Sequence, residues 1–109
     1  RVEDMAMQAQ KGSSTDTRYY SLGRGKTDRR MEPFFVELLP VAEAGRKLST
    51  HEGEEFIVVQ EGAVEVIYGG ETIILSKGDS IYLNSVVPHH VGCSGDAPAS
   101  IYAVLYFPE

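Results

Sequence analysis

The glycine pair Gly69-Gly70 is the feature that most constrains the fold, because it separates two short segments with the composition of β-strands. Residues 63–68 and 71–75 are rich in Val, Ile, Tyr and Thr, which favour extended backbone. A loop of two glycines supplies the positive φ angles that a tight hairpin turn requires. The sequence therefore predicts an antiparallel hairpin over residues 63–75.

The alternation of strand and turn continues along the chain from Tyr19 onward. Further strands are expected at residues 33–39, 55–60, 80–83 and 100–107, with turns rich in Gly, Pro, Ser and Asp between them. No convincing helical pattern separates these strands, so we expect an all-β antiparallel sandwich or barrel and exclude parallel α/β folds. Residues 101–106 are apolar on both faces, which indicates a covering surface outside the barrel, such as a dimer partner.

The first 17 residues have a different character. Four apolar residues fall at helical spacing, namely Val2, Met5, Ala6 and Ala9. Residues 2–10 are therefore expected to form a short helix or a disordered tail, and residues 12–17 have the composition of a polar linker. We divide the chain into residues 1–17, a linker or short N-terminal helix, and residues 18–109, the β-barrel domain. Since the chain begins at Arg1 rather than Met, we expect a fragment of a longer protein.

A chain of 109 residues with a formal net charge of −6 is expected to form one acidic domain around a single core. This charge argues against broad nucleic-acid binding by the chain as a whole, which needs clustered Lys and Arg. The single cysteine cannot form an internal disulfide. No apolar stretch approaches the ~20 residues that cross a bilayer, so we expect a cytoplasmic protein without a membrane partner.

Two further features have a structural and a functional interpretation. Residues 18–30 carry five basic side chains and one acidic one. A solvated turn is the preferred interpretation, and the alternative is that Arg29 or Arg30 binds an anionic effector. Cys93 has no obvious base beside it and is interpreted as a small packed residue rather than a nucleophile.

His51, Glu55 and His89 are the candidate metal ligands of the chain. Two imidazoles and one carboxylate can hold a divalent first-row metal and leave coordination positions open. Even separations along a strand place His51, Gly53 and Glu55 on one face, where Gly53 would leave space for water or an effector. The alternative from the residues alone is that these side chains are solvated or packed without metal.

His89 follows Pro88, which fixes the backbone and lacks a ladder donor, so His89 suits the entry to a strand. Its neighbour His90 should face the opposite way. We therefore predict His89 as the ligand and His90 as a half-buried or surface residue.

The spacing of these residues resembles the two motifs of the cupin superfamily. The first motif, Gly, five residues, His-x-His, three or four residues, Glu, six residues, Gly, is matched at Gly45, His51, Glu55 and Gly62, but Gly53 replaces the second His. The second motif is matched at Gly78 and His89 and departs at Asn84, Val86 and Cys93. The resemblance covers roughly residues 33–107 and implies a small double-stranded β-helix, or jelly-roll, barrel with a site reduced to two His and one carboxylate.

The run His51-Glu52-Gly53-Glu54-Glu55-Phe56 is similar to one branch of that superfamily, the sensor domains that follow a helix-turn-helix in transcriptional regulators of the XRE type. This resemblance implies a dimeric domain that binds a small-molecule effector and reaches DNA only through an upstream domain. A few metal enzymes share the two-domain plan, including the iron enzyme that makes a phosphonate epoxide.

The leading hypothesis is accordingly a metal-capable, effector-binding domain of a regulator, with Fe, Mn, Ni, Co or Zn at His51, Glu55 and His89. The alternative is a stand-alone metal-dependent dioxygenase, epoxidase or isomerase that acts on a small-molecule substrate. A third hypothesis is a metal-free metabolite-binding domain.

Overall fold

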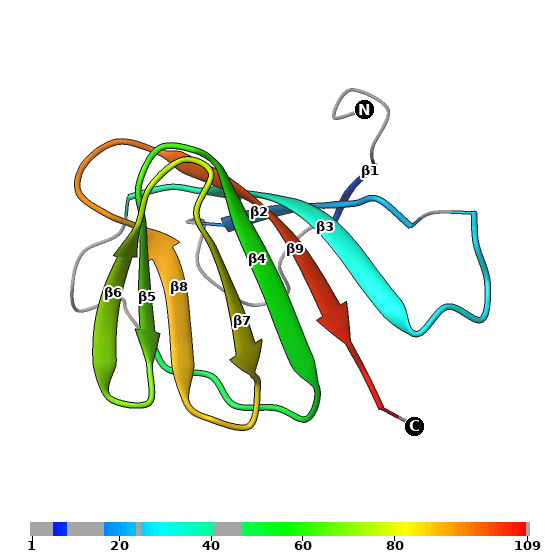
Figure 1. Cartoon of the computed structure of the whole chain (residues 1–109). Helices are drawn as coiled ribbons and strands as arrows, with labels where there is room; N and C mark the ends of the chain where they lie inside the picture. The colour runs from blue at the N-terminus through cyan, green and yellow to red at the C-terminus, as the bar shows by residue number, and fades with distance from the viewer. Residues whose placement is uncertain (1–5, 9–16, 24, 41–46, 109) are drawn as a thin grey trace.

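The computed structural model describes residues 6–8, 17–23, 25–40 and 47–108, which form nine strands (Figure 1). In chain order these strands are β1 (Ala6–Gln8), β2 (Thr17–Ser21), β3 (Met31–Leu38), β4 (Glu54–Glu61), β5 (Val64–Tyr68), β6 (Glu71–Leu75), β7 (Ser80–Asn84), β8 (His89–Cys93) and β9 (Ala99–Tyr106). Over these residues the structure contains no helix that could span a membrane.

The strands form two antiparallel sheets. The larger sheet has the order β1-β2-β3-β9-β4-β7, and the smaller sheet has the order β6-β5-β8. Strand β9 lies in the middle of the larger sheet, between β3 and β4 (Figure 1). The smaller sheet contains the predicted hairpin, and Gly69 and Gly70 adopt φ angles of 60° and 85° in its turn.

The core lies between the two sheets, and in the middle of the larger sheet buried and exposed residues alternate along the strands. In β4, Ile57 and Val59 are buried while Phe56 is exposed, and in β9, Ile101 is buried while Tyr102 is exposed. The smaller sheet contributes Val64, Val66, Leu75 and Cys93 to the same cluster. This alternation in β4 and in the second half of β9 places one face of each strand toward the interior and the other toward the outside.

The outer face of the larger sheet is unusually apolar. It exposes Met31, Phe56, Tyr82, Tyr102 and Tyr106, on strands β3, β4, β7 and β9. This is the outward apolar face that the sequence indicated for residues 101–106.

Most strand predictions agree with the structure to within a few residues, but the helical prediction for the N-terminus is wrong where it can be compared. Residues Ala6–Gln8 form a strand that pairs with β2, with Met7 opposite Tyr20. A helix of this length is marginal in water, whereas the edge of β2 offers backbone hydrogen bonds to an extended segment. The rest of that helix and the linker at 12–16 lie outside the described residues, and the domain division at residue 17 stays a prediction.

Candidate metal centre

The segment that carries His51 is fixed by backbone hydrogen bonds to β8 and to the turn before it. Ser49 and His89 exchange two N–H···O bonds of 2.8 and 3.0 Å, and the backbone N–H of His51 donates to the carbonyl of Ser85 at 3.0 Å. The hydroxyl of Thr50 donates to the carbonyl of Val86. The two histidines are thereby placed side by side even though they belong to distant parts of the chain.

Gly53 connects this segment to β4 in a conformation that excludes other residues. Its φ is +113°, a backbone conformation that residues with a Cβ rarely adopt. A Cβ at this position would overlap the backbone carbonyl of Tyr106. The sequence interpretation that Gly53 leaves space for a ligand is therefore wrong, because the missing side chain makes room for the end of β9 rather than for an effector.

The side chains of His51, Glu55 and His89 converge at the end of the barrel where β4 and β8 begin. Each offers one ligand atom, and these atoms lie within 4.8 Å of one another. The carboxylate of Glu55 lies 3.7 Å from Nε2 of His89, and the rings of His51 and His89 meet edge to face with centroids 5.3 Å apart. The side chains of His89 and Glu55 are 6% and 13% exposed. At 3.7 Å the two groups are too far apart for a direct hydrogen bond.

Nδ1 of each histidine lies near a backbone carbonyl. Nδ1 of His89 lies 2.8 Å from the carbonyl of Val87, and Nδ1 of His51 lies 3.2 Å from the carbonyl of Glu52. A carbonyl oxygen only accepts, so these contacts favour the tautomer with the hydrogen on Nδ1, in which Nε2 of a neutral ring keeps a lone pair. This is the arrangement found in metal-binding histidines, whose second nitrogen is held by a backbone carbonyl or carboxylate.

Burial raises the pKa of the Glu55 carboxyl above its ordinary value of 4.5, and the nearby His89 and His51 act in the opposite direction. The buried carboxylate therefore has too little positive charge around it in the protein alone. A divalent cation would supply that charge, so the donor set and its electrostatics fit a metal ion.

The remaining candidate residues lie apart from this cluster. Nδ1 of His90 lies 3.3 Å from the carbonyl of Lys47, and His90 is not among the three clustered ligands. Arg29 donates to the carbonyl of Lys26 and forms an ion pair with Glu32 at 2.8 Å, so its guanidinium holds the turn between β2 and β3. Cys93 is a buried thiol in the core, and Gly45 lies outside the described residues.

The contacts that support the site were missed by sequence reasoning. They are made by backbone groups of Ser85, Val86 and Val87 in the turn between β7 and β8. A backbone carbonyl has no residue signature, so no signal in the sequence identifies it.

The family model described as cupin domain matches residues 34–105. A search of curated proteins finds no match. The fold, with its two antiparallel sheets around one core, is that of a small β-barrel. The chain belongs to the cupin family.

Solved structures with the same fold include both enzymes and a regulator. The Fe(II) form of HppE with an alternative substrate is similar over 97% of this chain, with 24% identity and a TM-score of 0.82. Hydroxypropylphosphonic acid epoxidase from S. wedmorenis in complex with fosfomycin is similar over 98%, with 26% identity and a TM-score of 0.77. An HTH_3 family transcriptional regulator from Vibrio cholerae is similar over 86%, with 23% identity and a TM-score of 0.72. The chain spans 58%, 57% and 52% of these proteins, respectively.

The conformation of Gly53 generates a test of how the His51 segment is built. We expect Gly53→Ala to lower the free energy of unfolding by about 2–4 kcal/mol, because the variant combines backbone strain with overlap at Tyr106. The matched control is Gly70→Ala, which has φ of +85° but open space around it, and should cost about 1 kcal/mol. Denaturant unfolding measures both. Equal losses would show that the contact with Tyr106 has no energetic weight.

The raised pKa of Glu55 generates a test by pH. In metal-free protein the Glu55 carboxyl has a higher pKa in the native state than in the unfolded state. The stability that the neutral carboxyl contributes is therefore present below pH ~4.5, the unfolded pKa, and is lost as pH rises through the folded pKa. We expect Glu55→Gln to gain stability relative to the parent over that range. Thermal unfolding in chelator from pH 4 upward measures the difference.

The control for this pH test is Glu71→Gln, because Glu71 is exposed at the start of β6. Its difference from the parent should change little with pH. A Glu55→Gln curve parallel to that of the parent would contradict the assignment of Glu55 as a buried, poorly compensated acid.

Proposed function

We propose that this cupin domain binds a divalent metal ion through Nε2 of His51, the carboxylate of Glu55 and Nε2 of His89. The observation that carries the proposal is that one ligand atom from each of the three residues lies within 4.8 Å of the others, with both Nδ1 atoms close to backbone carbonyls. Fe, Mn, Ni, Co and Zn all accept this donor set. When bound, the metal supplies Lewis acidity and a point of attachment for an oxygen-bearing small molecule.

Three protein ligands leave coordination positions open, which suits capture of a small molecule rather than a purely structural role. His51 is only half-buried, whereas His89 is buried, so access from outside is on the His51 side. The site thereby combines a buried ligand, His89, with a partly exposed one, His51, past which a small molecule can enter. This supports small-molecule binding as the function of the site.

We place this binding function in a transcriptional regulator, where the domain detects an effector and an upstream helix-turn-helix binds DNA. The similarity to the regulator from Vibrio cholerae over 86% of this chain supports this context, as does the acidic charge of the domain. The protein would then act in the cytoplasm. Sequencing of the reading frame upstream of Arg1 tests the proposal, and absence of a DNA-binding segment there would remove it.

The second candidate is a metal-dependent enzyme. The similarity to an Fe(II) enzyme over 97% of this chain favours it, together with a donor set that is used by many non-haem iron oxygenases. It requires stoichiometric metal in the isolated protein and turnover that is lost in His51→Ala. A sensor requires effector binding without turnover.

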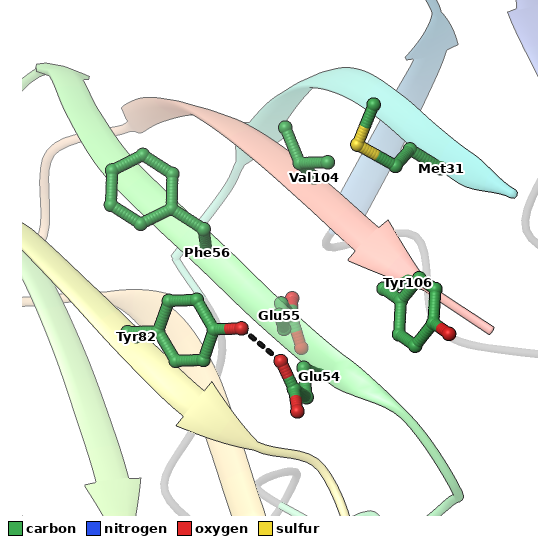
Figure 2. A pocket seen from close by; sticks show the side chains of 7 residues that line it. All are labelled: Met31, Glu54, Glu55, Phe56, Tyr82, Val104 and Tyr106. Carbon is green, nitrogen blue, oxygen red and sulfur yellow. Dashed lines mark hydrogen bonds between the residues drawn. The ribbon is translucent and has the colours of Figure 1, made fainter. Parts of the chain in front are cut away.

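We also propose that the domain is a homodimer formed through the outer face of the larger sheet. An open depression of about 430 Å³ on this face is lined by Met31, Glu54, Glu55, Phe56, Tyr82, Val104 and Tyr106. Figure 2 shows the aromatic rings around it and the hydrogen bond from Tyr82 to Glu54. Glu55 belongs to this lining, while its carboxylate lies 3.7 Å from Nε2 of His89. Apolar surface of this kind supports association.

Metal binding generates a direct test. We expect His51→Ala and His89→Ala to weaken Co²⁺ affinity about a hundredfold or more, because each removes a ligand. The matched control is His90→Ala, which should bind Co²⁺ like the parent. Calorimetric titration measures affinity, and chelator should lower the melting temperature of the metal-loaded parent and of His90→Ala, but not that of His51→Ala or His89→Ala. No metal in the parent, with no chelator effect, would favour the metal-free hypothesis.

The dimer generates a second test. We expect Phe56→Glu to convert the dimer to a monomer, because it places a charge in the apolar face. The control is Ile74→Glu on β6 of the smaller sheet, where Ile74 is 53% exposed, and it should leave the dimer intact. Sedimentation velocity measures the mass. A monomeric parent at micromolar concentration would refute the dimer.

A further inference from the structure

Ser85 is a buried polar residue that the proposed metal site does not use. It lies in the turn after β7, its exposed fraction is 0%, and its hydroxyl has no hydrogen-bond partner among the residues that the structure describes. Burying a hydroxyl without a partner costs free energy. Such a group is available to a partner outside the residues that the structure describes, such as a bound small molecule.

The backbone of Ser85 is bonded directly to the segment that carries the ligands. Its N–H donates to the carbonyl of Gly53, and its carbonyl accepts from the N–H of His51, both at 3.0 Å. The ladder between β4 and β7 pairs Glu54 with Asn84 and Glu55 with Leu83. Ser85 therefore follows in register, beside the link from His51 to Glu55.

The side chain of Ser85 faces the interior of the barrel. Alternation along the strand places it on the same side as Leu83, which is also fully buried. Glu55 lies opposite Leu83, so Ser85 and Glu55 are diagonal neighbours on one face, a separation that side chains can bridge together with a small ligand. The hydroxyl is thus on the face where the three ligands converge.

We propose that the Ser85 hydroxyl donates a hydrogen bond to a carboxylate oxygen of the small molecule captured at the metal site. This inference rests on the proposed function, because it assumes a metal held by His51, Glu55 and His89. The hydroxyl of Ser85 complements the three metal ligands, because a neutral hydroxyl donates to an anionic oxygen without adding charge of its own to a buried site. Ser85 would then strengthen the binding of ligands that present a carboxylate, while the three protein ligands hold the ion.

Acetate binding to the Co²⁺-loaded protein tests this role, with the visible absorption of Co²⁺ as the readout. We expect Ser85→Ala to keep its Co²⁺ affinity and to melt at the same or a higher temperature, because an unpaired buried hydroxyl has been removed. Its acetate affinity should fall about tenfold, the loss of one hydrogen bond to a charged group. Ser85→Gly removes the same hydroxyl and serves as a second variant if the first does not fold.

The matched control is Ser21→Ala. Ser21 is 2% exposed, and its hydroxyl also has no partner among the described residues, but it belongs to β2, which pairs with neither β4 nor β8. Its acetate affinity should equal that of the parent. An equal loss in both variants would overturn the assignment to Ser85.

The outcomes separate the two proposals. Unchanged acetate affinity in Ser85→Ala, with Co²⁺ bound, refutes the role of Ser85 and leaves the metal site standing. Loss of Co²⁺ affinity in the same variant also refutes it, because the hydroxyl would then support the protein ligands. If the parent binds no Co²⁺, the proposed function is refuted and the inference about Ser85 falls with it. If the parent binds Co²⁺ but its spectrum does not respond to acetate, only the inference about Ser85 is refuted.

Discussion

The site depends on the attachment of residues 49–51 to β8 and to the turn before it. The paired backbone bonds between Ser49 and His89, together with the bond from His51 to Ser85, join a segment that precedes β4 to strands that follow much later. Backbone bonds of this kind are insensitive to side-chain identity and hold their donors at fixed distances. The backbone pairing therefore determines the position of His51 relative to His89, and the two imidazole rings extend from backbone that is already in place.

A second constraint is the carboxylate that this geometry buries. Glu55 has the same strand parity as Ile57 and Val59, so its side chain enters the barrel where an apolar residue would pack at no electrostatic cost. The raised pKa of Glu55 is the signature of that cost. Strain and unpaired polar groups gather at functional sites because the surrounding fold can sustain them. Here the fully buried side chains of Ile57, Val64 and Leu83 provide that support.

Sequence reasoning predicted the antiparallel fold because its turns carry explicit signals, above all Gly69-Gly70. It also brought His51 and Glu55 together, but through strand parity that does not hold at Gly53, where φ is positive. It failed at β1, since the pairing of Ala6–Gln8 depends on an edge supplied by β2 and not on local propensity. It could not find the carbonyl contacts to Nδ1 of His51 and His89, because every residue possesses a carbonyl group.

The central position of β9 has a consequence for the rate of folding. Strands β3 and β4 do not pair with each other, and each has one edge that is paired only with β9. In the pairing of β3 with β9, Met31 lies opposite Tyr106 and Leu38 opposite Ala99. Contacts between residues this distant in sequence close large loops and slow the search for the native state. Until β9 inserts, two apolar strands have open edges that can pair with other molecules. The barrel is thus exposed to aggregation for as long as its middle strand is missing, and a chaperone that shields β3 and β4 would improve its yield.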